Sequence, residues 1–391
     1  MAFFDFFKYS KDKNVKSEDF SFWNTGNDNS VDLNSYLERY NTSNYIWFGD
    51  TNQYPNYLNN LYNSSGLHSA IIDFEQNFIT GSGYTIEGED SLTPMEKVDL
   101  TQFLNFFDGT NDLEFVIEEV VKDYLLHGTI YFKQFWNSDK TKVIRFKRVE
   151  PSQVRLGVDP EDKSEINRVY HNLDWAQYGN FNTTMLPLFK AGNTNREAIE
   201  VFRFAKPNNA LLYNTAPTYA AATNWINLDG EISTFHKSNI ENSINPSLTI
   251  KFKDRPAPEE QRAIARKIDS QLTGARNAGK PLIIFGDGEN APEIEPVPVS
   301  NLDDQFNITA DAIQRNICYA HKINPLIMGL KSPGSLGNST ELDTAFGIYT
   351  RGVIEPVQKQ VESVINKLLK LKQLSVTFKF NEVKPLSKKE D

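Results

Sequence analysis

The chain has 391 residues, of which 39% are hydrophobic and 24% charged, so it has the apolar content for a sizeable core and is not a disordered chain. Its net charge of −10 argues against a protein whose main task is to grip DNA through the phosphates, because such proteins carry a basic surface. The single cysteine, Cys318, excludes a disulfide framework and a cysteine-rich zinc site. No run approaches the roughly 18 apolar residues of a membrane span, and the N-terminus lacks the pattern of a signal peptide.

The acidic excess is confined to one part of the chain. Residues 1–213 hold 30 acidic and 20 basic side chains, so this part alone accounts for the net charge. Two interpretations stay open. The acidic residues form an ordinary soluble surface, or they form a surface that repels nucleic acid or meets a basic partner.

The first half of the chain predicts an α+β unit. Residues 1–45 are polar and rich in Asn, Ser and Asp, which indicates an N-terminal arm. Apolar residues at helical spacing then predict four helices, followed by strands wherever the hydrophobic alternation has period 2. The helices are expected around residues 57–62, 67–78, 94–108 and 113–127. The strands are expected around residues 84–86, 130–135, 143–147, 154–158, 169–174 and 199–205.

The second half begins with a long helix and a small module. A helix is predicted from Pro217 to about residue 243, with Thr215 as its possible cap. Residues 244–299 then predict a β-α-β module. Its strands are expected at 248–252, 282–285 and 294–299, and its helix at 258–272.

Two further long helices flank a Gly/Ser-rich loop. The first is expected over residues 301–324 and ends before Pro325, and the loop covers residues 329–338. The second runs over residues 339–371 with Pro356 near its middle, where the missing N–H predicts a kink. A strand at 376–380 and a charged tail complete the chain.

No residue pattern predicts an active site. The five histidines are scattered, Cys318 has no local base, and residues 108–112 lack the closing Glu of a calcium loop, so structural roles are favoured for all of them. The loop at 329–338 also fails as a phosphate-binding loop, because Ser335 stands where that motif requires Lys. It is either a mobile polar loop with a function or a plain connection between two helices. No cofactor and no metal is expected.

The order of these elements resembles the portal protein family of tailed phages. The resemblance rests on the helix, small module, return helix, Gly/Ser loop and kinked helix, which follow one another in that order. Sequence motifs similar to the family's lie at residues 324–329, 337–341, 346–356 and 365–369, and weaker ones at 61–71 and 81–83.

The resemblance implies a portal-like α+β architecture with named regions. Residues 1–45 would be an arm, 46–213 a mixed α/β wing, 214–243 and 300–324 stem helices, and 244–299 a clip. Residues 325–338 would be the tunnel loop region and 339–373 a long kinked wing helix. Residues 374–391 form a strand and tail that are too short for the crown domain, which is therefore minimal or absent.

The resemblance also implies a function and its site residues. A ring of identical subunits, usually twelve, would sit at one capsid vertex of a virion assembled in the bacterial cytoplasm, and double-stranded DNA would pass through it. Its other partners would be the terminase motor, the head–tail adaptor and the major capsid protein, with no membrane. The expected tunnel-loop residues are Lys331, Ser332, Gly334, Ser335, Gly337 and Asn338. The expected clip interface consists of Lys251, Lys253, Arg255, Arg262 and Arg266.

Two other classes of protein remain as alternatives. The first is a virion adaptor or scaffold, monomeric or oligomeric, without a DNA channel. The second, a packaging ATPase or nuclease, is disfavoured because the sequence lacks the P-loop lysine and a clear cluster of metal-binding carboxylates.

Overall fold

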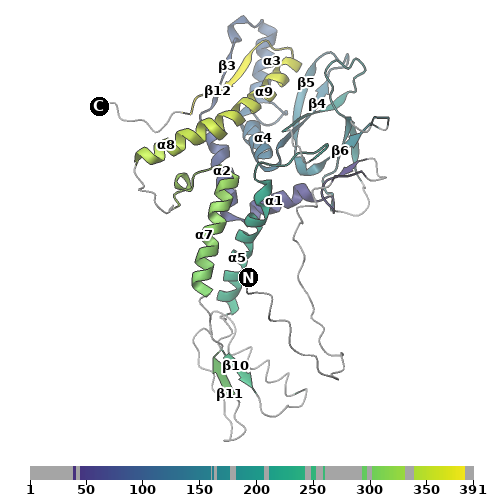
Figure 1. Ribbon diagram of the computed structural model, residues 1–391. Helices are drawn as coiled ribbons and strands as arrows, with labels where there is room; N and C mark the ends of the chain where they lie inside the picture. The colour runs from purple at the N-terminus through teal and green to yellow at the C-terminus, as the bar shows by residue number, and fades with distance from the viewer. Residues whose placement is uncertain are drawn as a thin grey trace, which may run out of the picture. The chain divides into compact units, whose positions relative to one another are not determined.

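The elements of the chain combine helices with several small antiparallel sheets (Figure 1). The structure is a computed structural model. The residues that it describes belong to one compact unit, Ser35–Asp391. The structure describes residues 38–40, 45–159, 161–162, 165–176, 182–206, 211–242, 248–251, 259, 293–296, 302–330 and 339–383.

Two consecutive helices open the main core after a short antiparallel pair, β1 (Arg39–Tyr40) with β2 (Ile46–Trp47). Helix α1 (Tyr54–Ser64) starts with Pro55, whose fixed φ suits the first turn. Helix α2 (Gly66–Thr80) is capped by Ser65, whose hydroxyl accepts a hydrogen bond from the His68 backbone N–H. Both helices bury their apolar face, as the periodicity predicts.

The next two helices have well-defined capping residues. Helix α3 (Pro94–Asn105) begins with a capping box formed by Thr93 and Glu96. Helix α4 (Leu113–His127) is capped by Asp112 and ends at Gly128, whose φ of +71° is open to glycine at little cost. A Cβ at Gly128 would also come within 3.1 Å of the Ala216 carbonyl oxygen. Between the two helices, Asp108 Oδ1 accepts hydrogen bonds from two backbone N–H groups, so this segment is a turn, as expected.

Two three-stranded antiparallel sheets follow these helices. Strand β4 (Thr129–Trp136) lies between β5 (Val143–Val149) and β9 (Ile199–Ala205), and the order of the other sheet is β6 (Val154–Val158), β7 (Ile166–His171), β8 (Thr184–Pro187). Strand β7 begins three residues before the predicted strand. Strand β8 was not predicted, because its four residues end in Pro187 and their pairing depends on β7 rather than on a local pattern.

The last strand of the chain forms a two-stranded sheet with a strand that lies far away in the sequence. Strand β12 (Thr377–Phe380) pairs antiparallel with β3 (Tyr84–Glu87), so the two ends of this part of the fold are joined. A large hydrophobic core extends under α1, α2, α4, α7, α9 and β4, and a smaller one lies between β2 and the β6–β7–β8 sheet.

Helix α5 (Thr223–Asn242) is shorter than predicted at its start. Residues 220–222 form a 3₁₀ turn instead of α-helix, and Thr215 is not a cap, because its hydroxyl donates to the Lys206 carbonyl. Tyr219, fully buried, donates its hydroxyl to the Leu126 carbonyl and holds this turn on the end of α4. The tertiary contact therefore overrides the helical preference that Pro217 indicates.

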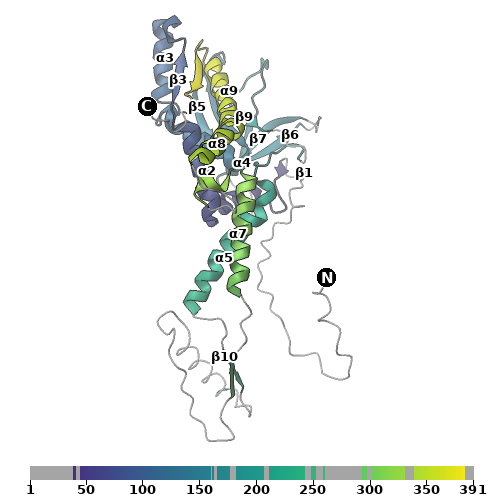
Figure 2. The same cartoon turned by 60° about the vertical axis from the view of Figure 1, so that its left-hand side comes forward.

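Helix α7 (Leu302–Ala320) packs beside α5, and the two lie side by side in both views (Figures 1 and 2). Between them in sequence, β10 (Leu248–Lys251) pairs antiparallel with β11 (Glu293–Pro296), and the two overlap strands expected at 248–252 and 294–299. The expected helix 258–272 and strand 282–285 lie outside the described residues.

The last long helix is continuous but changes its hydrogen-bonding pattern. Helix α8 (Ser339–Tyr349) passes through a π-helical turn, Thr350–Ile354, into α9 (Glu355–Leu371). Pro356 is the second residue after this turn, in the first turn of α9, and a π turn accommodates a residue that cannot donate to the α-helical ladder. The kink predicted at Pro356 stays a prediction. Among the described residues, no helix is long and apolar enough to cross a membrane.

Candidate functional site

The loop singled out by the sequence is held at both ends by described structure. Lys331, Ser332, Gly334, Ser335, Gly337 and Asn338 lie outside the described residues, which resume at Ser339. Of the expected clip residues, Lys251 is the last residue of β10, and Lys253, Arg255, Arg262 and Arg266 also lie outside them. The site can therefore be built from the two flanks of the loop.

The flank before the loop is a tight chain reversal. After α7, Lys322 adopts a left-handed conformation with φ of +57°, which is uncommon for a residue with a side chain. The Asn324 side chain then accepts a hydrogen bond from the Leu326 N–H and caps the 3₁₀ turn Pro325–Met328, which ends at Gly329 with φ of +72°. These contacts fix the direction in which the chain enters the loop.

The flank after the loop is anchored by a buried polar cluster that links α2, α7 and α8. The Tyr349 hydroxyl of α8 donates to Glu75 Oε1 of α2 at 2.8 Å, and His321, directly after α7, places its Nδ1 3.5 Å from the same oxygen. His321 Nε2 lies 2.9 Å from His68 Nδ1. All four side chains are buried, so the cluster ties both flanks of the loop to α2.

The contacts of the cluster form one hydrogen-bonded chain. His321 faces the Glu75 carboxylate through Nδ1 and the His68 ring through Nε2, so it links the carboxylate to His68. Burial, and secondly the neighbouring His321, hold the pKa of His68 well below its usual value, which agrees with a neutral ring. Burial, and secondly Glu75, raise the pKa of Tyr349, so its hydroxyl keeps the proton that it donates.

Aromatic side chains complete the anchoring of α8 on α2. Phe78 meets Phe346 edge-on at 5.1 Å between ring centroids, and Phe74 lies 6.3 Å from Tyr349. Tyr219 stacks on His321 at 5.3 Å and an interplanar angle of 19°. Such contacts are directional as well as apolar, so they restrict how the loop flanks can move relative to each other.

A cavity of about 140 Å³ lies next to this cluster. Its wall includes Lys206, which follows β9, and Lys322, together with Glu75 and His321 of the cluster. The π turn and the start of α9 form another side of it. The cavity thus joins the loop flanks to the β-sheet part of the fold.

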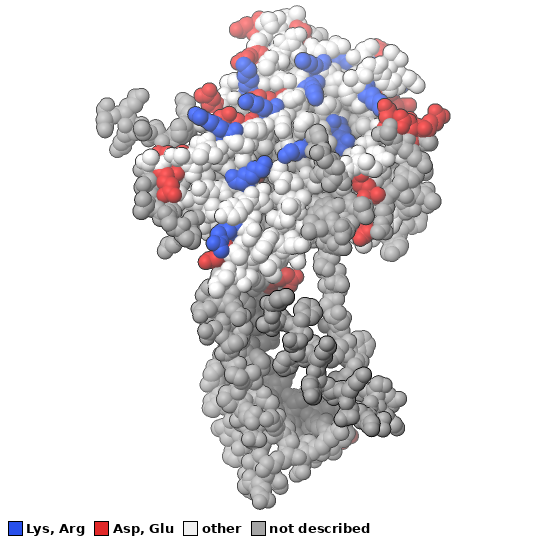
Figure 3. Space-filling view, viewed as in Figure 1, with Lys and Arg blue, Asp and Glu red and all other residues white. Residues whose placement is uncertain are grey.

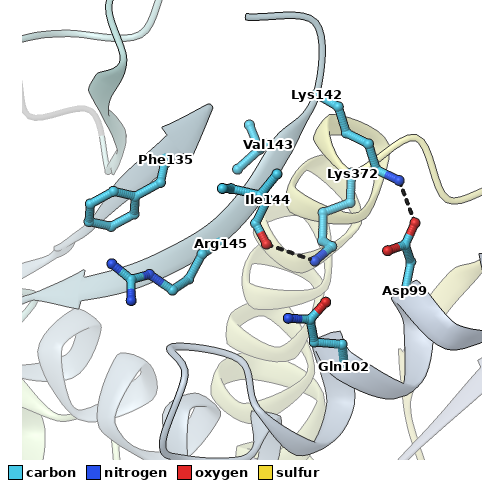
Figure 4. A pocket seen from close by; sticks show the side chains of 8 residues that line it. All are labelled: Asp99, Gln102, Phe135, Lys142, Val143, Ile144, Arg145 and Lys372. Atoms are coloured by element: carbon cyan, nitrogen blue, oxygen red, sulfur yellow. Dashed lines mark hydrogen bonds and ion pairs between the residues drawn. The ribbon is translucent and has the colours of Figure 1, made fainter. Parts of the chain in front are cut away.

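A second, larger cavity of about 370 Å³ lies between α3, β5 and the end of α9 (Figure 4). Its cations have partners within the wall. Lys142 pairs with Asp99, the buried Lys372 donates to the Ile144 carbonyl at 3.1 Å, and the Arg145 guanidinium lies 4.3 Å above the Phe135 ring. These contacts join α3, β5 and the end of α9, so we assign this cavity a structural role.

The basic residues are unevenly distributed over the surface. Figure 3 shows Lys and Arg side chains in a band across the middle of one face, with Asp and Glu mainly toward its edges. The exposed side of α9 alone carries Lys359, Lys367 and Lys370. A chain with a net charge of −10 therefore presents a face on which basic residues are prominent.

The other residues that the sequence analysis considered for catalysis or metal binding are Cys318 and the histidines. Cys318 is buried, and burial raises the pKa of its thiol to about 11, which fits an inert side chain. Among the described residues, no group of three His, Cys, Asp or Glu side chains could hold a metal ion. The pairing of His68 with His321 was not predicted, because no local pattern connects residues 253 positions apart.

Several known structures contain a chain whose fold is similar to this one. Two structures of gene transfer agent particles contain a chain with a similar fold. For the virion of the native particle, the TM-score is 0.56 at 14% identity, covering 87% of this chain and 86% of that one. For the neck of the empty particle computed with C6 symmetry, it is 0.55 at 15% identity, covering 82% of each chain. A portal protein of the HK97 family from Corynebacterium diphtheriae is also similar, with a TM-score of 0.47, 12% identity and coverage of 82% and 93%.

The fold is therefore similar to that of chains in these gene transfer agent particles. The sequence model described as "Phage portal protein" matches residues 108–391, and the chain belongs to the phage portal protein family. No curated protein matches the chain.

Proposed function

We propose that this chain assembles into a closed ring that forms a conduit for double-stranded DNA at one vertex of a capsid. The observation that carries the proposal is the family match over residues 108–391, which includes the anchored flanks of the loop. In a ring of head-to-tail contacts, each subunit presents one surface to its neighbour on one side and a different surface on the other. Twelve subunits are proposed, following the resemblance.

The proposed regions follow the elements of the fold. The wing comprises residues 46–213 and the long helix 339–373, the stem comprises α5 and α7, and the clip is the module at 244–299. The loop at 329–338 would reach into the channel, as the family resemblance implies, and the cluster around Glu75 would hold its flanks on α2. Its polar side chains would touch phosphates without reading sequence, which suits a conduit.

The proposed partners follow from the position in the particle. The clip would contact the packaging motor and later the head–tail adaptor, and the wing would face the capsid shell. No catalytic role is proposed, since the chain would guide DNA that another protein moves.

Negative-stain microscopy of the purified chain, combined with mass photometry, tests the proposal. We expect rings with a central hole and a mass near twelve times 44.6 kDa. A chain that stays monomeric, alone and with capsid protein added, would contradict the ring and favour an adaptor or scaffold. An ATPase or nuclease activity that co-purifies with the chain would instead indicate a packaging enzyme.

A further inference from the structure

The cavity beside the loop flanks contains an unbalanced pair of positive charges. Lys206 and Lys322 both line it, and burial, and secondly the charge of Lys322, lower the pKa of Lys206. Lys206 is half-buried while Lys322 is exposed, and the two like charges repel each other across the cavity. Within the described part of the chain, no ion pair involves either ammonium group.

The carboxylate already present in the wall balances only part of this charge. Among the described residues, Glu75 is the one acidic side chain that lines the cavity, so two lysines face a single carboxylate, whose oxygen also accepts the Tyr349 hydroxyl and faces His321. The larger cavity in Figure 4 provides a contrast, because each of its cations has a partner in its own wall. The smaller cavity thus holds one positive charge more than the described part of its wall balances.

The backbone holds the two lysines in fixed positions. The N–H of Lys206 donates to the Gly128 carbonyl at 3.0 Å, and its carbonyl accepts from the Thr215 hydroxyl at 2.6 Å. Lys322 is kept in its left-handed conformation between α7 and the turn that Asn324 caps. A non-glycine residue is strained in this conformation, and such strain persists where the surroundings enforce it.

We propose that this cavity is a socket that receives a carboxylate side chain of a second copy of this chain. The size of the cavity supports that occupant, since about 140 Å³ accommodates the end of one Asp or Glu side chain but is well below the ~300 Å³ at which small-molecule pockets begin. The inference rests on the proposed ring.

Charge indicates the source of the carboxylate. The chain holds 51 acidic against 41 basic side chains, and the excess lies in residues 1–213, so a neighbouring copy offers many carboxylates. A head-to-tail ring contact joins two different surfaces, so the socket of one subunit can meet an acidic surface of the next. The contact would also lock the flanks of the loop, because Lys322 begins the reversal that leads into it.

Two neutralising substitutions test the socket. Lys206→Gln removes one charge, and Lys322→Gly removes the other while keeping a residue suited to positive φ. Lys140→Gly is the matched control, because Lys140 is an exposed lysine with φ of +55° that does not line the cavity. We expect the double variant to need at least about ten times more protein for half-assembly by mass photometry, with the control unchanged. Circular dichroism would verify that each variant is folded.

A cross-link identifies the partner. Rings assembled from equal amounts of ¹⁴N- and ¹⁵N-labelled chains would be treated with a carbodiimide, which couples a lysine amine to a carboxylate that it contacts. We expect mixed-label peptides that join Lys206 or Lys322 to an Asp or Glu. Cross-links confined to one label would overturn the proposal.

The outcomes separate the socket from the ring. A wild-type chain that never assembles contradicts the ring, and the socket is refuted with it. Normal wild-type rings with a double variant that assembles equally well contradict the socket alone. A double variant that assembles normally but binds a 30-base-pair duplex more weakly in fluorescence anisotropy would assign the cavity to phosphate and overturn the proposal.

Discussion

At the scale of single residues, the Tyr349 hydroxyl is the most informative contact of the loop flanks. Changing Tyr349→Phe removes a donor from the buried Glu75 carboxylate and leaves that oxygen with the more distant His321. We expect the free energy of unfolding to fall by about 1–3 kcal/mol, the cost of leaving a buried polar group short of a partner. Urea unfolding followed by fluorescence would measure it.

The control for this substitution is Tyr319→Phe, because Tyr319 is 67% exposed on α7. We expect its effect to stay within about 0.5 kcal/mol. Equal effects of the two substitutions would show that the hydroxyl of Tyr349 contributes nothing specific.

The buried histidines predict how stability depends on pH. Burial, and secondly His321, lower the pKa of His68, and burial, and secondly Arg148 and Arg155, lower the pKa of His127 to about 3. Because the folded pKa lies below the unfolded one, the unfolded state binds more protons between them. Stability is thus complete above about pH 6.5 and is lost as the pH falls.

Each such histidine should cost about 1.4 kcal/mol of stability between pH 7.5 and pH 5.5. Urea unfolding at both pH values would measure the change in the free energy of unfolding. The substitution His127→Leu should reduce this change by about 1.4 kcal/mol. His236→Gln, on the exposed side of α5, should keep the parent's pH dependence, since it leaves both buried rings in place. A His127→Leu variant that keeps the full pH dependence of the parent would refute the buried neutral state of His127.

At the scale of elements, the capping box of α3 shows how a local signal shapes a helix. The Thr93 hydroxyl accepts a hydrogen bond from the Glu96 N–H, and the Glu96 carboxylate accepts one from the Thr93 N–H at 2.8 Å. Thr93→Ala should raise amide hydrogen exchange in the first turn of α3 roughly five-fold. Exchange at the far end of the chain, in β12, should not change.

Thr101→Ala is the matched control within the same helix. Thr101 is exposed, and its hydroxyl donates to the Lys97 carbonyl, a bond that does not support the helix end. We expect unchanged or slightly slower exchange, because alanine favours helix. If both variants exchanged alike, the capping box would not be what holds the start of α3.

At the scale of the whole molecule, the loop separates assembly from transport of DNA. Deleting residues 332–336 should leave ring assembly largely intact, because Tyr349, His321 and Glu75 hold the flanks independently of the loop tip. Packaging or retention of DNA should be impaired, as measured by a DNase-protection assay on assembled particles. Lys331→Glu should have a milder effect that weakens as salt is added. A deletion that packages and retains DNA like the parent would reduce the loop to a plain connection.

The sequence by itself determined the elements whose signals are local. The periodicity of α1 to α4 and α7 and the alternation of β4 each lie within one short segment, so neighbouring residues suffice to specify them. The portal resemblance used the order of these elements, and the family match agrees with it.

The tertiary structure decided whatever depends on distant residues. It paired His68 with His321, added β8 to β7, and shortened α5 because Tyr219 is bound to the Leu126 carbonyl. It also placed Lys206 and Lys322 in one cavity, although they lie 116 positions apart in the sequence. No periodicity connects such residues, because packing between elements alone brings them together.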